Sequence, residues 1–176
     1  MEPLECFAAV ASCDAEILIL GSMPGDKSLQ QQQYYAHPRN SFWFIMQQIL
    51  NVDKIESYAE RLKLLQQHRI ALWDVMQNCV REGSLDSAIK SSSVVANNFL
   101  NFFQSNNNIQ SVFFNGARAE QEYRKHVLPD VKSFFPDMKY TRLPSTSPAM
   151  ASMNREQKLV IWREAIKCHQ DTRDLF

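Results

Sequence analysis

Apolar residues follow two kinds of pattern that alternate along this chain. Short continuous apolar runs that stop at a turn residue indicate buried strands, and apolar residues three or four positions apart indicate helices. The predicted strands are 17–20, 69–75, 109–114 and 138–143. The predicted helices are 41–50, 54–67 (capped by Asp53), 94–103, 117–127 and 154–169, and residues 1–14 are expected to be a lead-in with one short helix over the sheet edge.

Strands that alternate with helices, without an internal repeat, predict an α/β fold. We expect one three-layer α/β/α domain over residues 1–176, with a central parallel sheet of about four strands covered on both faces. The carboxyl ends of parallel strands meet at one edge of the sheet, where open α/β sheets bind their ligands. Four loops are predicted to converge there: 21–25, 73–74, 115–116 and 144–150.

The charge of the chain is balanced, with 19 basic and 19 acidic side chains and a net charge of zero. A neutral protein has no general attraction for nucleic acid, so any contact with DNA requires a local basic patch. The basic residues that flank the converging loops are Lys27, Arg39, Arg142 and Arg155.

The cysteines exclude several classes of protein. Cys6, Cys13, Cys79 and Cys168 form no Cys-x-x-Cys pair, and the histidines are scattered, so we expect no metal and no cofactor. Nothing indicates a disulfide framework, and reduced thiols are typical of an intracellular protein, here a cytoplasmic one. We also expect no signal peptide and no membrane span.

The most informative stretch begins where the first predicted strand ends. Gly21 and Gly25 permit tight turning and close approach of the backbone to a ligand, and Pro24 stiffens the loop between them. After a polar segment, two pairs of aromatic residues flank a side-chain amide at Asn40. The aromatic residues are Tyr34, Tyr35, Phe42 and Trp43, of which roughly half should belong to the core. This order suits a pocket that stacks a flat ring and fixes it with one amide.

The ordered set of Gly-x-x-Pro-Gly, Tyr-Tyr and Pro-x-Asn-x-Phe-Trp resembles the first motif of the uracil-DNA glycosylase superfamily. The variant in this chain, GSMPG followed by YYAHPRNSFW, is similar to the hypoxanthine-DNA (deoxyinosine) glycosylase branch. The resemblance implies a uracil-DNA glycosylase-like fold and an enzyme that binds double-stranded DNA containing a deaminated base. Such an enzyme flips the damaged nucleoside into its pocket and hydrolyses the bond between base and sugar. We expect it to act as a monomer.

Asn40 has two interpretations. From the residues alone, it is a suitable N-cap for the helix that follows. In the resembled branch, the Asn of the Pro-x-Asn-x-Phe-Trp motif is the catalytic residue, and Asn40 matches that position. Its amide could orient a water molecule or donate a hydrogen bond to the leaving base.

Two positions depart from the pattern of many superfamily members. Met23 stands at the third position of the glycine–proline loop, where many relatives carry an Asp or Asn that handles the attacking water. Ser145 stands where relatives have His or Asn. Both departures argue against efficient excision of uracil. The deoxyinosine branch itself has a non-polar residue at the position of Met23, so the resemblance favours hypoxanthine.

The base pocket implied by the resemblance is lined by Gly21, Ser22, Met23, Pro24, Gly25, Tyr35, Phe42 and Asp74. Asp74 is either a turn or capping carboxylate, or a group that accepts from hypoxanthine N1–H or positions water. Tyr35 is our candidate for stacking on the flipped base. Asp26 is expected to be a solvated turn residue.

Residues 143–148 resemble the superfamily's second motif, the loop that enters the minor groove. The candidate DNA contacts are Ser145, Thr146, Ser147, Pro148, Met150 and Arg118. Small hydroxyls and backbone N–H groups can bind phosphates, and Met150 is a candidate wedge for the gap left by the flipped base. The junction before Arg118 is also explained as a tight turn into a helix, although the Arg118 side chain could reach a phosphate.

These patterns together predict a monofunctional DNA glycosylase that prefers deoxyinosine and leaves an abasic site. The motifs contain no catalytic Lys, so neither a Schiff base nor a lyase step is expected. One alternative is a mismatch-type uracil or thymine glycosylase. The other is a non-catalytic α/β module that binds nucleotides or nucleic acid, although the loop at 21–26 lacks the Gly-x-Gly-x-x-Gly fingerprint.

Overall fold

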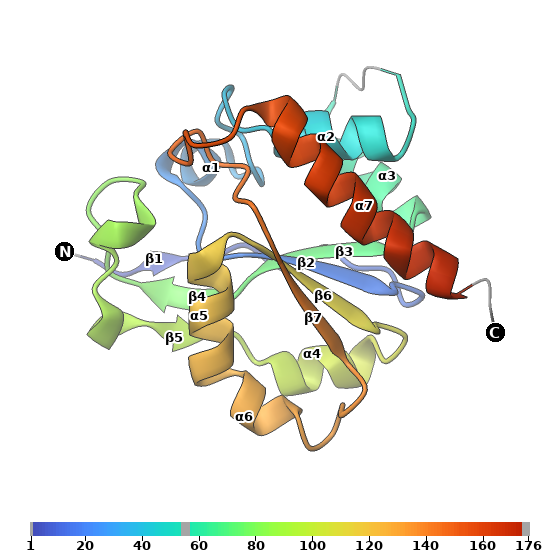
Figure 1. Cartoon of the computed structure of the whole chain (residues 1–176). Helices are drawn as coiled ribbons and strands as arrows, with labels where there is room; N and C mark the ends of the chain where they lie inside the picture. Colours follow the sequence, from blue (N-terminus) through green and yellow to red (C-terminus); the bar gives the residue numbers. More distant parts are fainter. Residues whose placement is uncertain (1, 54–56, 174–176) are drawn as a thin grey trace.

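The computed structural model, which describes residues 2–53 and 57–173, is built on a four-stranded parallel sheet (Figure 1). The strands lie in the order β3-β2-β6-β7. Their bounds are Ile17–Gly21 (β2), Ile70–Asp74 (β3), Ser111–Asn115 (β6) and Lys139–Leu143 (β7). The predicted fold class and all four predicted strands are therefore confirmed.

Strand β2 lies inside the sheet, and all five of its residues are buried. It pairs in parallel with β3 on one side and with β6 on the other. Successive side chains of a strand point to opposite faces, so Ile17 and Ile19 pack in one apolar cluster while Leu18 and Leu20 pack in the other. An uninterrupted apolar run is what a strand with two covered faces requires.

Helices cover both faces of the sheet and complete a three-layer α/β/α arrangement (Figure 1). On the face that receives Ile17 and Ile19 lie α2 (Phe42–Ile49), α3 (Tyr58–Gln67) and α7 (Arg155–Arg173). On the opposite face lie α4 (Phe99–Ser105), α5 (Ala117–His126) and α6 (Leu128–Val131). A short helix, α1 (Asp26–Gln31), follows the glycine–proline loop after β2.

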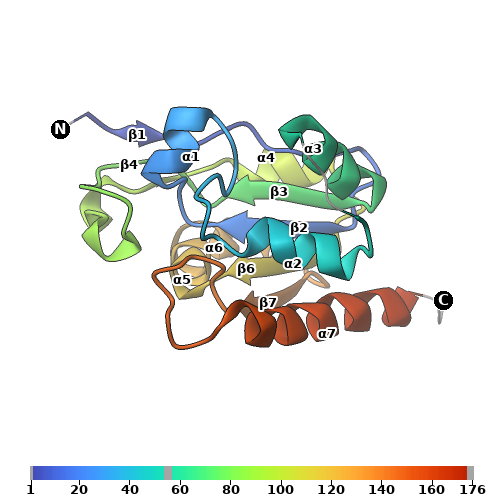
Figure 2. The same ribbon diagram turned by 90° about the horizontal axis from the view of Figure 1, so that it is seen from above.

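A second, antiparallel sheet was not predicted. It contains β1 (Leu4–Glu5), β4 (Met76–Cys79) and β5 (Val95–Ala96), in the order β1-β4-β5. Strand β4 continues almost directly from β3, so the chain runs past the edge of the central sheet into the small one. In Figure 2 the arrowheads of the parallel strands point towards α1 and this smaller sheet. The small sheet thereby extends the side of the molecule where the strands end.

Two expectations about helix positions were wrong because short strands pair there instead. Residues 4–5 pair with β4, so the described lead-in contains a strand rather than the expected helix. The helix predicted from residue 94 begins only at Phe99, because Val95 and Ala96 pair with β4. Asn98 then caps the helix by accepting a hydrogen bond from the Asn101 N–H.

The ends of two further helices also differ from expectation. Helix α3 begins at Tyr58, and its cap is Ser57 rather than Asp53, because Ser57 and Glu60 form a reciprocal capping box. The predicted start at residues 54–56 lies outside the described residues. Helix α7 extends to Arg173, past the expected end at His169. None of the described helices is long and apolar enough to cross a membrane.

Candidate active site

A cavity of about 570 Å³ lies where the four parallel strands end. Its wall is formed by residues 21–28, 84–87 and 145–150 together with Tyr34, Tyr35, His37, Asn40, Asp74 and Asn115. The predicted convergence of four loops is confirmed, since 21–25, Asp74, Asn115 and 145–150 all contribute. The volume is in the range of pockets that hold a small organic ligand.

Asp74 ends β3 and lies in the wall of this cavity, directly across from Gly21 in the sheet register. Only 3% of the residue is exposed, and no described residue forms a hydrogen bond with Oδ2. Burial, followed by the negative charge of Asp86, raises the pKa of Asp74 to about 8, against the opposing effect of Arg81. The folded protein therefore favours the protonated form of Asp74, and a protonated carboxyl can donate one hydrogen bond and accept others.

Position 21 requires glycine because the side chains of Asp74 and Tyr35 lie against its backbone. A Cβ at position 21 would lie 2.4 Å from Asp74 Oδ1 and 3.2 Å from the Tyr35 hydroxyl oxygen. A methyl group cannot occupy that space, so glycine leaves room for the Asp74 carboxyl and the Tyr35 hydroxyl beside the first loop.

We expect Gly21→Ala to lower the free energy of unfolding by about 1–3 kcal/mol, the usual cost of overpacking a filled interior. Gly25→Ala is the matched control in the same loop, because its Cβ would meet only Ser84 atoms at 3.7 and 3.8 Å. Urea unfolding of both variants measures the difference. Equal losses for the two variants would show that the space around Asp74 is not the constraint.

Asn40 lies immediately before α2, half-buried at the cavity wall. Its Oδ1 accepts a hydrogen bond from the Phe42 N–H at 3.0 Å. Because a backbone N–H needs an acceptor, this contact identifies the oxygen and leaves the amide nitrogen as the group available to a ligand. The N-cap of α2 is Ser41, so the interpretation of Asn40 as the N-cap is corrected. Asn40 precedes the cap, its oxygen accepts from the first N–H of the helix, and its nitrogen can serve the cavity.

Tyr35 is held against the core by Phe42. The two rings stack with their centroids 4.0 Å apart and an angle of 25° between their planes. Tyr35 adopts a φ of 55°, which is uncommon for a bulky residue, and such backbone conformations often occur at functional sites. Phe42 is fully buried and does not line the cavity, so its predicted place in the pocket wall is corrected to a support behind Tyr35. Trp43 is likewise a core residue.

The loop at 145–150 is fastened from three sides. The Asn115 side chain accepts from the Thr146 N–H at 2.8 Å and donates to the Thr146 hydroxyl at 2.9 Å. The Ser41 N–H donates to the Thr146 carbonyl, and Lys158 from α7 donates to the carbonyls of residues 147 and 150. Thr146 is fully buried, so its hydroxyl supports the loop and is not presented to DNA as predicted. Ser145, Ser147 and Met150 remain partly exposed.

Comparison with known proteins assigns the fold and the cavity to a family. Residues 8–166 match the model of the Uracil DNA glycosylase superfamily. The chain belongs to this superfamily. It is 40% identical over 114 residues to a protein of Methanosarcina barkeri (strain Fusaro) named Hypoxanthine DNA glycosylase, a match that covers 64% of this chain and 71% of the relative. A protein of the same name from Methanosarcina acetivorans is 39% identical over the same shares.

A solved structure agrees with this assignment. The solution NMR structure of a Methanosarcina acetivorans protein, provisionally described as a uracil DNA glycosylase, superimposes with a TM-score of 0.74 and 33% identity. The match covers 93% of this chain and 98% of the other. Family, relatives and fold together identify a DNA glycosylase, a hydrolase of the bond between base and sugar in DNA.

Whether Arg118 contacts a DNA phosphate stays a prediction, but its side chain lies outside the cavity wall. Its guanidinium forms an ion pair with Glu122 at 2.9 Å and hydrogen bonds to Ser91, and it does not line the cavity of the glycosylase. Two of the four basic residues expected to flank the loops form ion pairs: Arg142 lies 3.4 Å from Glu120, and Arg155 pairs with Glu156. Of these four basic residues, Lys27 lines the cavity.

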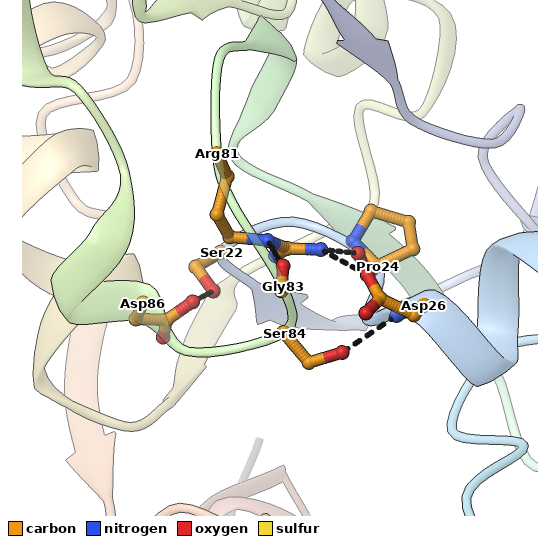
Figure 3. A network of polar contacts seen from close by, with 7 residues as sticks. All are labelled: Ser22, Pro24, Asp26, Arg81, Gly83, Ser84 and Asp86. Atoms are coloured by element: carbon orange, nitrogen blue, oxygen red, sulfur yellow. Dashed lines mark hydrogen bonds and ion pairs between the residues drawn. The ribbon is translucent and has the colours of Figure 1, made fainter.

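The segment 81–87 contributes four cavity residues that sequence reasoning missed. It lies between the strand predicted at 69–75 and the helix predicted at 94–103, and it folds back against the glycine–proline loop (Figure 3). The buried Arg81 guanidinium donates to the carbonyls of Pro24 at 2.7 Å and Gly83 at 2.6 Å. Ser84 and Asp86 then reach the first loop, and no local pattern in the sequence indicates these long-range contacts.

Proposed function

We propose that this glycosylase excises hypoxanthine from deoxyinosine in double-stranded DNA and leaves an abasic site. The buried carboxyl of Asp74 in the cavity wall, whose Oδ2 has no hydrogen-bond partner among the described residues, is the observation that carries the proposal. The Watson–Crick edge of hypoxanthine presents one donor, N1–H, beside one acceptor, O6. An un-ionised carboxyl presents one acceptor and one donor, so the two edges are complementary. The names of both Methanosarcina relatives support the same substrate.

The remaining cavity groups fit the handling of a flipped purine. Tyr35, supported from behind by Phe42, offers a rigid ring for stacking. The Asn40 amide nitrogen donates to the leaving base, because the Asn40 oxygen is already engaged by Phe42. The fastened loop at 145–150 contacts the DNA backbone through the hydroxyls of Ser145 and Ser147, which accept from backbone N–H groups within the loop and can each still donate to a phosphate, and Met150 enters the gap in the duplex.

A uracil or thymine glycosylase is the second candidate, supported by the description of the NMR structure. Met23 argues against it. Its side chain is packed with Met76, Cys79 and Ile89, and a thioether neither ionises nor orients water as a carboxylate does.

Single-turnover cleavage of duplexes that carry one hypoxanthine, uracil or xanthine tests the proposal. Uracil presents the same pair of groups through N3–H and O4, but its single ring fills less of the cavity than a purine, so we expect hypoxanthine to be released at least about tenfold faster. Alkali should be needed to break the strand, and borohydride should trap no adduct. Faster release of uracil would overturn the assigned substrate, and binding of every duplex without cleavage would favour the non-catalytic alternative.

A further inference from the structure

The segment 81–87 places a further aspartate, Asp86, in the cavity wall beside the first loop. We propose that Asp86 is a catalytic residue whose carboxylate binds the attacking water and accepts its proton. This inference rests on the proposed hydrolysis of a base–sugar bond, but it does not depend on which base is removed.

The position of Asp86 is set by a network that ties its segment to the first loop (Figure 3). The Arg81 side chain is fully buried. Its guanidinium donates to the Pro24 carbonyl and also lies 3.7 Å from Asp26. The Ser84 hydroxyl accepts from the Asp26 N–H at 2.9 Å. These contacts on both sides of residue 83 hold the segment firmly, as a group that positions a water molecule must be held.

One oxygen of Asp86 is engaged by the first loop. The Ser22 hydroxyl donates to Asp86 Oδ1 at 2.8 Å. A carboxylate has two oxygens with about four lone pairs, so this bond orients the group and leaves Oδ2 able to accept from water. Asp86 is half-buried, which keeps it in contact with the open cavity.

Three carboxyl groups of the described residues line the cavity, and their surroundings assign them different states. The Asp26 side chain is 47% exposed and lies near Arg81, so it belongs to the rim. Asp74 is buried, which favours its protonated form. Burial raises the pKa of Asp86 as well, but the Ser22 hydroxyl and the guanidinium groups of Arg81 and Arg118 all favour its ionised form. The Ser22 hydroxyl and the two guanidinium groups thus favour a negative charge on Asp86, and that charge disfavours ionisation of Asp74.

His37 also lines the cavity, but its Nδ1 already accepts from the Arg39 N–H. The two motif positions expected to handle water, Asn40 and Met23, cannot supply a base. Asn40 presents an amide nitrogen, which donates only, and Met23 is packed in an apolar cluster. The charge that develops on the sugar during cleavage is positive, so an anion on the cavity wall stabilises the transition state as well as the water. Asp86 is the described cavity carboxylate that fits both requirements.

The step then balances in atoms and charge. The bond between C1′ and N9 of the base breaks, and its electron pair leaves with the purine. A water oxygen forms a bond to C1′ while Asp86 takes one proton from that water. The Asp74 carboxyl donates its proton to the departing purine, and exchange with solvent returns Asp86 to its ionised state and Asp74 to its protonated state. The products are an abasic sugar and a neutral base.

Asp86→Asn tests the role, because an amide keeps an oxygen for the Ser22 hydroxyl but removes the negative charge. We expect the single-turnover rate constant to fall by on the order of a hundredfold or more, as for loss of a general base. Affinity for a duplex with uncleavable 2′-fluoro-deoxyinosine should stay within about threefold of wild type, since the change acts on the transition state. Glu82→Gln is the matched control, because Glu82 is an exposed acid of the same segment and does not line the cavity.

Two further measurements separate chemistry from structure. The wild-type rate should fall on acidification as Asp86 takes up a proton, and Asp86→Asn should lack this acid limb. Added formate should restore part of the activity of Asp86→Ala, because it supplies the missing carboxylate. A rate for Asp86→Asn within about threefold of wild type would overturn the role of Asp86 and leave the proposed function standing. Wild-type cleavage of uracil but not hypoxanthine would overturn only the substrate, and cleavage of no duplex would overturn both proposals.

Discussion

Asn40→Ala is expected to slow single-turnover cleavage of a deoxyinosine duplex by on the order of a hundredfold or more, the size of effect typical of a key catalytic group. The variant removes the amide nitrogen that the structure leaves free at the cavity wall. It also removes the oxygen that accepts from the Phe42 N–H at the start of α2, so we expect an additional loss of about 1 kcal/mol in the free energy of unfolding. The cleavage assay and urea unfolding measure the two effects separately.

Asn40→Asp is the control that separates these two functions of one side chain. Aspartate keeps an oxygen for the Phe42 N–H at the start of α2, so stability should stay within about 0.5 kcal/mol of wild type. It lacks the N–H donor, so its rate should fall nearly as far as that of the alanine variant. A fully active Asn40→Asp would mean that the oxygen, acting on water, is the working atom.

The fold could be predicted from sequence because its signals are local. Strand β2 is buried on both faces, and such a strand must be apolar at every position, which is how residues 17–20 look in the sequence. Each parallel strand is followed by a turn residue, and the geometry of a parallel sheet brings those turns together. The places of Asp74 and Asn115 at the cavity follow from this geometry.

The missed features depend on contacts between distant segments. Strand β5 has only two residues, and its pairing with β4 overrides the helical spacing of residues 94–103. The segment 81–87 carries ordinary loop residues, and its place in the site depends on Arg81 reaching a carbonyl 57 positions earlier in the chain. A pattern within a short window cannot report such a contact.

Phe42 and Thr146 illustrate a second limit. Both lie in the motifs that form the site, but their side chains support other residues of the cavity wall. Phe42 stacks against the Tyr35 ring, and the Thr146 hydroxyl accepts from Asn115. Membership in a motif indicates that a residue is needed near the site. Whether its side chain faces the ligand or the core is decided by packing, which the motif does not describe.

Asp74 should make the glycosylase less stable as the pH rises. Its pKa is about 8 in the folded protein and 3.8 without the fold. Between these values the folded protein keeps a proton that the unfolded chain has released, so the free energy of unfolding falls with increasing pH. The stabilisation present at acidic pH is lost through this window, by about 4 kcal/mol at pH 7 if each pH unit contributes about 1.4 kcal/mol.

Asp74→Asn should therefore raise stability while it impairs catalysis. The amide has the same shape and cannot ionise, so its melting temperature should exceed that of wild type by on the order of 10 °C at pH 8 and match it near pH 4. Asp137→Asn, at an exposed position, should show no such pH-dependent gain.

The same substitution should change the pH–rate profile. Wild-type cleavage should decline above about pH 8, where Asp74 loses the proton that we assign to the departing base. Asp74→Asn should be slower and should lack this alkaline limb, because an amide donates hydrogen bonds but does not transfer a proton. A variant that is slower yet no more stable than wild type at pH 8 would show that Asp74 is ionised in the resting enzyme, and the hydrogen bond to hypoxanthine would then run from N1–H to a carboxylate. A variant that gains stability and loses the alkaline limb would show that the fold keeps an unfavourable buried acid because the reaction uses its proton.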